Sequence, residues 1–174
     1  MTDVAAAASL ACTGLCIACL AYLHLSPTGY SPLRNAVSEY GVGSYARWYQ
    51  AQATAAGLAA VALAVALGGP RRVVLLLALF AGARLAITQA PLDRRRVAHW
   101  LLAVLAFGSA AVAGVRLKPL DHGTPALGWA MLAFVLLMAI ARKSPELRGW
   151  FGLIERGFYV SMLAWLALVA ARLV

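Results

Sequence analysis

The stretch HLSPTGYSPLRNAVSEYG, residues 24–41, is the longest polar interval in a chain that is otherwise mostly apolar. It directly follows VAAAASLACTGLCIACLAYL, residues 4–23. That run is long enough to cross the ~30 Å hydrocarbon layer of a membrane, because ~20 helical residues at ~1.5 Å each suffice. We interpret the polar stretch as a re-entrant or interfacial segment that joins the first two membrane helices and forms part of the wall of a polar site.

The composition of the whole chain supports a membrane fold. Its 174 residues are 63% hydrophobic with a mean hydropathy of +0.81, whereas soluble chains are roughly 45–50% apolar. Lipid offers no hydrogen-bond partner, so a spanning segment must be a helix or part of a closed barrel. The apolar runs are continuous and rich in Ala, Leu and Val, which favours helices. We therefore predict an all-α integral membrane protein, with residues 1–174 forming one domain.

Turn and cap signals divide the chain into six predicted membrane helices. Gly68 and Gly69 end the second helix, Pro91 ends the third, and Asp93 is the expected N-cap of the fourth. Most connections are short, which favours a bundle of antiparallel neighbours. The predicted ranges are 4–23, 44–67, 70–90, 94–117, 124–142 and 145–172.

The polar stretch itself contains the signature of a short amphipathic helix over residues 32–40. Ser31 followed by Pro32 is a helix-start signal, and Gly41 is a stop signal. At helical spacing the residues separate into two faces. We expect an apolar face of Leu33, Ala36, Val37 and Tyr40, and a polar face of Arg34, Asn35, Ser38 and Glu39.

Chemically useful side chains gather at one membrane face. An even number of helices places both termini at one face, and the connections after the first, third and fifth helices at the other, which we call the aromatic face. An ordinary aromatic belt decorates both interfaces, but all six tyrosines lie at or near this one face. Four of the six acids, Glu39, Asp93, Glu146 and Glu155, lie there too. This asymmetry predicts a polar site at the aromatic face.

The residues of that face suit acid/base chemistry on an amphiphile. Carboxylates and imidazoles in a partly dehydrated site have shifted pKa values and can exchange protons with a substrate. We predict catalytic roles for Glu39, Asp93, His99 and Glu155. Arginines hold anionic headgroups, and the predicted substrate-binding set is Arg34, Ser38, Tyr40, Arg84, Arg156 and Tyr159.

Simpler readings of these residues remain open. Asp93 can serve only as a helix cap, and His99 as a satisfied hydrogen-bonding group. Glu155 and Arg156 can form an interfacial ion pair. Arg84 lies roughly 9 Å inside the third predicted helix, where a charge costs ~2.5–3.5 kcal/mol. Because its side chain leans deeper into the membrane, we expect an internal acidic partner (Asp93, Glu155 or Glu39) rather than snorkelling.

No metal site, cofactor or nucleic-acid partner is predicted. Cys12, Cys16 and Cys19 share one helix face and are interpreted as packing residues. His24 and His99 lack metal-ligand spacing. The net charge of +9 would suggest nucleic acid in a soluble chain. Here the arginines lie in the connections between spans, where they meet lipid headgroups.

Short motifs in a fixed order resemble a known family. They are Ser38-Glu39-Tyr40-Gly41, Pro91-Leu92-Asp93, His99 before an Ala-rich helix, and Glu155-Arg156. Together they resemble the prokaryotic membrane family catalogued as domain of unknown function 998, over His24 to Trp165. The family usually has Asp where this chain has Glu39, and an aromatic followed by Pro-Thr-Asp where it has residues 90–93. The resemblance implies six helices and a polar face, and no activity.

These observations favour a membrane-embedded enzyme acting on a lipid or isoprenoid-like amphiphile. A non-catalytic lipid or small-ligand binder, or an accessory subunit of a membrane complex, is the alternative. A transporter is less favoured because no inverted repeat is visible. The expected partner is a membrane lipid or amphiphilic small molecule, with a homo-oligomer also possible.

The expected location is the prokaryotic plasma membrane. Basic residues are more frequent at the aromatic face than at the terminal face, eight against five. By the positive-inside rule this places the aromatic face in the cytoplasm. The eight are Arg34, Arg47, Arg94, Arg95, Arg96, Arg142, Lys143 and Arg148, and the five are Arg71, Arg72, Arg116, Lys118 and Arg172.

Overall fold

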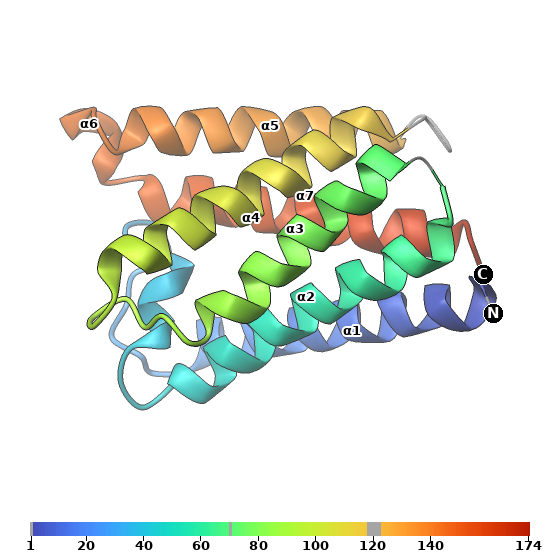
Figure 1. The fold of residues 1–174 in the computed structure, drawn as a ribbon. Coiled ribbons are helices and arrows are strands. Elements are labelled where there is room, and N and C mark those ends of the chain that lie inside the picture. Colours follow the sequence, from blue (N-terminus) through green and yellow to red (C-terminus); the bar gives the residue numbers. More distant parts are fainter. Residues whose placement is uncertain (1, 70, 118–122) are drawn as a thin grey trace.

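A computed structural model describes residues 2–69, 71–117 and 123–174. Over these ranges the chain is all-helical, and its long helices run antiparallel to their sequence neighbours (Figure 1). Both termini lie at one end of the bundle, as the even helix number predicts. The elements are α1 (Thr2–Leu25), η1 (Val37–Gly41), α2 (Ala46–Leu67), α3 (Arg71–Ile87), α4 (Arg96–Arg116), α5 (Gly123–Ala141), α6 (Pro145–Arg148) and α7 (Phe151–Ala171).

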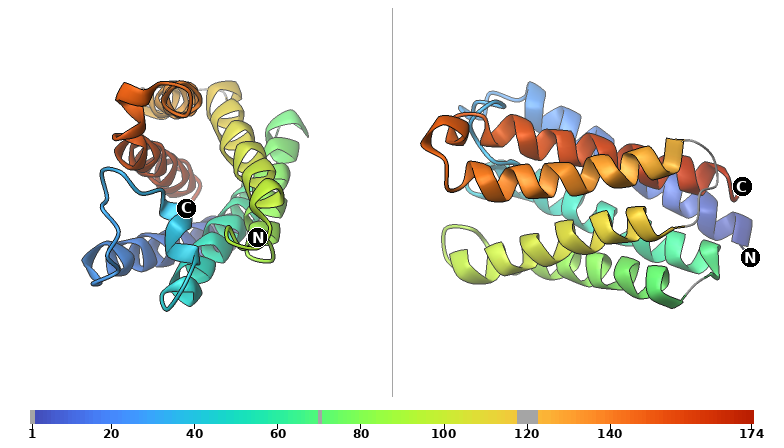
Figure 2. Two further views of the ribbon diagram at one scale, coloured as in Figure 1. Left: turned by 90° about the vertical axis from the view of Figure 1, so that its left-hand side faces the viewer. Right: turned by 90° about the horizontal axis from the view of Figure 1, so that it is seen from above.

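The long helices form a closed ring. Each packs against the next along the chain, and α7 returns to pack against α1. Figure 2, viewed from the end, shows this ring and places α1 beside α7. The first and last helices therefore share an interface although they lie at opposite ends of the sequence.

Five of the described helices are long and apolar enough to cross a membrane: α1, α2, α4, α5 and α7. Their outward faces carry large exposed apolar side chains such as Val65, Val104, Leu136 and Val160. Such faces are stable only against hydrocarbon. The chain is a multi-pass membrane protein. The sixth long helix, α3, has 17 residues and begins with two arginines.

Small residues allow the helices to approach closely. A Cβ atom built on Gly128 of α5 would lie 2.5 Å from the backbone carbonyl carbon of Gly114 in α4. One built on Gly157 of α7 would lie 2.4 Å from the ring of Phe134 in α5. Membrane helices have no hydrophobic drive toward each other, so this close van der Waals contact is a main source of their association.

Three details of the predicted helices were wrong. The sixth predicted helix, 145–172, is interrupted at Gly149 and Trp150 and forms α6 and α7. Ser144 does cap α6, since its hydroxyl accepts a hydrogen bond from the Leu147 N–H at 3.4 Å. Asp93 does not cap α4; the N-cap is Arg95, without a side-chain cap bond. Pro70 and Lys118, used in the predictions, lie outside the described residues.

The third error is the amphipathic helix predicted over residues 32–40. Residues 32–35 form turns instead, and only η1 is helical, with 3₁₀ geometry. Local side chains compete for the backbone groups that a helix would use. The Asn35 side-chain oxygen accepts from the Ser31 N–H at 2.8 Å, and Glu39 Oε1 accepts from the Ala36 N–H at 2.9 Å.

Candidate functional site

The polar connection between α1 and α2, residues 26–45, covers one end of the bundle opposite the termini (Figure 1). We call it the covering segment. Val37 and Tyr40 are buried as predicted, whereas Leu33 is 46% exposed. The segment is therefore held by its 3₁₀ turn and by specific bonds to α7 rather than by a continuous apolar face.

Glu155 supplies the first bond between α7 and the covering segment. Its Oε2 accepts a hydrogen bond from the Val37 N–H at 2.7 Å, and the residue is only 4% exposed. Close by, the Leu153 N–H donates to the Leu33 carbonyl oxygen at 3.1 Å. Glu155 and Arg156 attract each other electrostatically but are not in direct contact. Between described residues, a contact ion pair joins only Arg94 and Asp93.

Arg156 joins α7 to both α1 and the covering segment. Its Nε donates to His24 Nε2 at 2.6 Å, and its Nη2 donates to the Tyr40 hydroxyl at 3.2 Å. Its Nη1 donates to two carbonyl oxygens, of Asn35 at 2.8 Å and of Gly152 at 2.9 Å. The hydroxyl and carbonyl acceptors are neutral groups, and so is His24, as its own bonds show.

The bonds of His24 fix its protonation state. Because Arg156 donates to Nε2, that nitrogen must be an acceptor. The Nδ1 atom lies 2.6 Å from the Leu20 carbonyl oxygen and must therefore carry the proton. His24 is a neutral imidazole with both nitrogens engaged. Its bond to Leu20 is the one expected of a histidine at the end of a helix, which can satisfy one of the last carbonyl groups. Its link to Arg156 was not predicted.

A second polar cluster is buried between α2, α3 and α7. Arg84 is 1% exposed, and it donates from Nη1 to the Tyr159 hydroxyl at 3.1 Å and from Nη2 to Gln52 Oε1 at 3.0 Å. The Cys16 thiol of α1 also contacts Gln52 Oε1, at 3.5 Å. The Arg84 Nε has no hydrogen-bond partner within the described residues.

The internal position of Arg84 agrees with expectation, but its partners do not. Asp93, Glu155 and Glu39 were the expected acids, and the observed partners are a phenol and an amide. Gln52 was missed. It lies six residues into α2, where the neighbouring amide Gln50 is exposed and Gln52 is buried, and a buried amide requires a polar partner.

The other predicted catalytic residues lie elsewhere. His99 Nδ1 contacts the Ala90 carbonyl oxygen at 2.7 Å, and its ring stacks on Tyr49 with centroids 6.3 Å apart. Asp93 is exposed in the turn before α4. Glu39 is half-buried and binds Asn35 and Ala36 of its own segment. Of the predicted substrate-binding residues, Ser38 is half-buried and Arg34 is exposed.

A groove lies on the outside of the ring between α1 and α7, with a volume of about 520 Å³. Most of its lining is apolar, and three polar side chains mark one end: His24, Arg156 and Tyr159. Tyr159 thus belongs both to the groove and to the Arg84 cluster. The apolar lining consists of Ile17, Leu20, Ala21, Val37, Val160, Leu163, Ala164 and Ala167.

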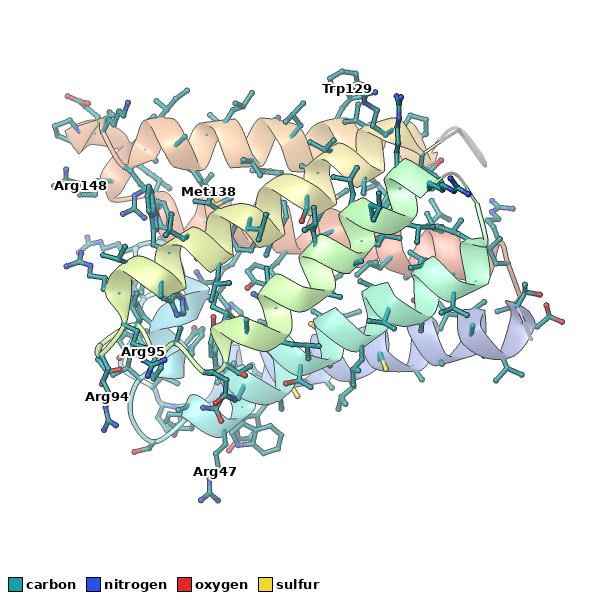
Figure 3. All side chains as sticks on the ribbon, viewed as in Figure 1. Arg47, Arg94, Arg95, Trp129, Met138 and Arg148 are labelled. Atoms are coloured by element: carbon teal, nitrogen blue, oxygen red, sulfur yellow. The ribbon has the colours of Figure 1, made fainter. Side chains whose placement is uncertain are left out.

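The end of the bundle that bears the covering segment is strongly basic. Figure 3 shows Arg47, Arg94, Arg95 and Arg148 projecting away from the helices there. In the same region Arg142 lies over the Trp100 ring, 4.5 Å from its centroid, and partial burial together with Arg96 lowers its pKa. The Ser144 hydroxyl lowers the pKa of Glu146 by donating to its carboxylate.

Within the described ranges, no group of three or more His, Cys, Asp or Glu side chains is placed to hold a metal ion. Cys12, Cys16 and Cys19 are free thiols on α1. The arrangement therefore offers hydrogen-bond donors and positive charge next to an apolar groove.

Comparison with known proteins gives one match. No curated protein and no solved structure matches the chain. The family described as "Protein of unknown function (DUF998)" matches residues 10–172, nearly the whole sequence. The chain belongs to the DUF998 family of membrane proteins.

Proposed function

We propose that the protein binds a membrane amphiphile whose hydrocarbon chain lies in the groove between α1 and α7. The observation that carries this proposal is the groove itself, whose exposed surface is almost wholly apolar and whose lining at one end includes His24, Arg156 and Tyr159. Its walls include exposed side chains such as Ile17 and Val160. A lipid can therefore enter sideways from the surrounding bilayer without crossing water.

The length of the groove supports an occupant from a single leaflet. Along α7 the lining extends from Arg156 to Ala167, which is about 16 Å at ~1.5 Å per residue. This is about half of the ~30 Å hydrocarbon thickness of a bilayer. A chain lying in the groove would keep its polar end near His24, Arg156 and Tyr159, at the depth of the headgroups.

Binding is favoured over acid/base catalysis. Of the four predicted catalytic residues, only Glu155 is next to a groove residue, and its carboxylate is bonded to the covering segment. Asp93 is exposed, and His99 is engaged with Ala90 and Tyr49. A catalytic role would therefore rest on Glu155 alone, and a Glu155→Gln variant that binds lipid normally but no longer converts it would favour that second function.

We also propose that α3 crosses the membrane as the sixth span and that the end bearing the covering segment faces the cytoplasm. The support is the position of α3 between α2 and α4 in the ring and the arginines that project from that end, such as Arg47, Arg94 and Arg148 (Figure 3). Anionic lipids of the cytoplasmic leaflet attract such basic residues. A homo-oligomer formed through the remaining exposed apolar faces is compatible with this arrangement.

The groove is tested by filling it. We expect Ala164→Trp to block the chain, and the matched control Ala139→Trp, on an exposed position of α5 outside the groove, to leave it open. The measurement is the amount of lipid that remains bound after purification in detergent, counted by native mass spectrometry. Equal lipid on both variants, with unchanged melting temperatures, would show that the groove is not the binding site.

A further inference from the structure

We infer that the amphiphile in the groove carries an anionic headgroup, which is held by the Arg156 guanidinium and the Tyr159 hydroxyl. Arg84 acts as a positioning residue behind Tyr159. This inference rests on the proposed binding of a chain in the groove, and it adds the chemical class of the ligand and the groups that select it.

The first argument is charge. Arg156 lines the groove at the end that also bears His24 and Tyr159, and Arg84 lies behind Tyr159. Neither arginine forms an ion pair with a described carboxylate. Their partners are neutral amide, phenol, imidazole and carbonyl groups. A positive charge in a dehydrated region is unfavourable unless an anion lies close to it. The buried Glu155 carboxylate supplies one negative charge near the two guanidinium groups without contacting either of them. A ligand carboxylate or phosphate would supply the second.

The nearby acids do not supply this charge by direct contact. Glu155 uses Oε2 to accept from the Val37 N–H, and Glu39 is bonded to Asn35 and Ala36. Both carboxylates therefore hold the covering segment in place. The described ion pair, between Arg94 and Asp93 at 3.9 Å, is on the surface.

The second argument is the number of hydrogen-bond donors. A guanidinium has five N–H groups, and the four bonds of Arg156 to His24, Asn35, Gly152 and Tyr40 use four of them. One Nη2–H remains for a ligand. Since Arg156 lines the groove, this remaining donor is available to a headgroup at its polar end.

Tyr159 supplies the second donor. Its oxygen accepts from Arg84 Nη1, so its own hydroxyl proton must be donated to a different acceptor. The Gln52 side chain is close enough to be that acceptor, and a headgroup in the groove would compete with it. A hydroxyl that accepts from a cation is a stronger donor, because hydrogen bonds in series polarise one another. Residues three apart on a helix lie on the same face, so Tyr159 and Arg156 present their donors to one headgroup.

The ligand that fits is a single hydrocarbon chain with one anionic end. A groove of about 520 Å³ offers one channel, and its apolar length corresponds to one leaflet. A fatty carboxylate and a single-chain phosphate ester both have this chemistry. Carboxylate and phosphate oxygens are the acceptors that guanidinium groups bind best.

The experiment measures binding of defined amphiphiles to the delipidated full chain in a neutral detergent, by native mass spectrometry titration. The probes are palmitate, oleoyl lysophosphatidate, hexadecanol and hexadecyltrimethylammonium. We expect the anionic probes to bind at least about tenfold more tightly than hexadecanol, as charge-assisted hydrogen bonds are stronger than neutral ones. The tighter of palmitate and lysophosphatidate identifies the headgroup as carboxylate or phosphate.

Variants of the two donors test their roles. Tyr159→Phe keeps the ring and should weaken binding of the preferred anion about tenfold, with little change for hexadecyltrimethylammonium. Arg156→Gln should weaken it further. Arg156 also holds the covering segment, so Arg156→Gln can fail to fold. In that case the Tyr159→Phe result alone tests whether the donors bind the anion.

A double-mutant cycle tests the positioning role of Arg84. Arg84→Met should weaken anion binding in the native background but have little effect when Tyr159→Phe is present, because both changes remove the same donor. A purely structural role would lower affinity equally in both backgrounds.

The possible failures are distinguishable. Equal affinity for palmitate, lysophosphatidate, hexadecanol and the cationic probe would overturn the anionic headgroup and leave the proposed chain binding intact. Absence of binding by every probe, together with no effect of Ala164→Trp on native lipid, would overturn the proposed function itself.

Discussion

Arg156 donates its Nε hydrogen to Nε2 of His24 across 2.6 Å, and this bond joins the beginning of α7 to the end of α1. Two consequences follow from it. The imidazole is held neutral, with Nδ1 donating to Leu20, and the guanidinium is held at the polar end of the groove. The bond thus links two helices and also fixes the orientation of the Arg156 guanidinium beside the groove.

Replacing His24 by Ala should weaken this link. The Arg156 Nε would lose its acceptor at a half-buried position, and we expect the free energy of unfolding in detergent to fall by about 1 kcal/mol. Ser26→Ala is the matched control, because Ser26 bonds only the Tyr22 carbonyl oxygen near the same helix end. Similar melting temperatures for the two variants would contradict the prediction.

Glu155 should control how firmly the covering segment is held. Glu155→Ala leaves the buried Val37 N–H without an acceptor and should cost about 2 kcal/mol, whereas Glu155→Gln retains an acceptor oxygen and should cost less. Limited trypsin digestion after the exposed Arg34 reports on the segment directly. We expect faster cleavage in Glu155→Ala than in the native chain, with cleavage after Arg47 unchanged as the internal control.

The buried Arg84 cluster should respond unevenly to substitution. Arg84→Lys keeps the charge but loses the planar fork that reaches both Tyr159 and Gln52, and we expect a loss of about 3 kcal/mol. The double variant Arg84→Met with Gln52→Leu removes both members of the Arg84–Gln52 bond. It should lose less free energy of unfolding than Arg84→Met alone, because the Gln52 amide is then not left without its arginine partner. Thermal unfolding in detergent measures both. A double variant less stable than the single one would contradict this account.

The contact between α4 and α5 depends on glycine. Gly128→Ala would place its Cβ 2.5 Å from the backbone of Gly114, and because backbone cannot rotate aside, we expect a loss of about 2–3 kcal/mol. Gly108→Ala in α4 meets no atom within 4 Å and should leave stability unchanged or raise it by up to about 1 kcal/mol. The difference in melting temperature between these two variants is the test.

Reporter fusions test the proposed orientation. With α3 as a sixth span and the basic end in the cytoplasm, the C-terminus lies on the far side of the membrane. A C-terminal alkaline phosphatase fusion should therefore be active in a bacterial host and a green fluorescent protein fusion dark. The reverse pattern would place the covering segment outside the cell.

The helical bundle was predictable because its signals are local and repeated. Apolar length locates a span, and glycine or proline marks its end; Gly68, for example, ends α2 in a left-handed conformation with φ of 49°. Likewise, the placement of the termini followed from parity alone. The break at Gly149 and Trp150 was missed because either residue can continue a helix, and the choice depends on packing.

The site was less predictable because its partners are distant and neutral. The sequence indicated that Arg84 is internal, and an acidic partner was expected from its charge. The neutral side chains of Gln52 and Tyr159 accept its hydrogen bonds instead. Grouping residues by membrane face placed His99 with Glu155. Their contacts differ, since His99 contacts α2 and the turn after α3, whereas Glu155 bonds the covering segment. The sequence indicates at which membrane face a residue lies. It does not indicate on which side of the bundle, around the bundle axis, the residue lies, and a site depends on both.

Because α1 packs against α7, the groove between them can form only after α7 has been synthesised. The groove has one wall from the first helix and one from the last, and the bond from Arg156 to His24 joins residues 132 positions apart. During synthesis His24 and Arg84 enter the membrane before their α7 partners, Arg156 and Tyr159, exist. The groove is therefore completed only when α7 inserts, so the proposed lipid can be retained there only from that point of synthesis onward.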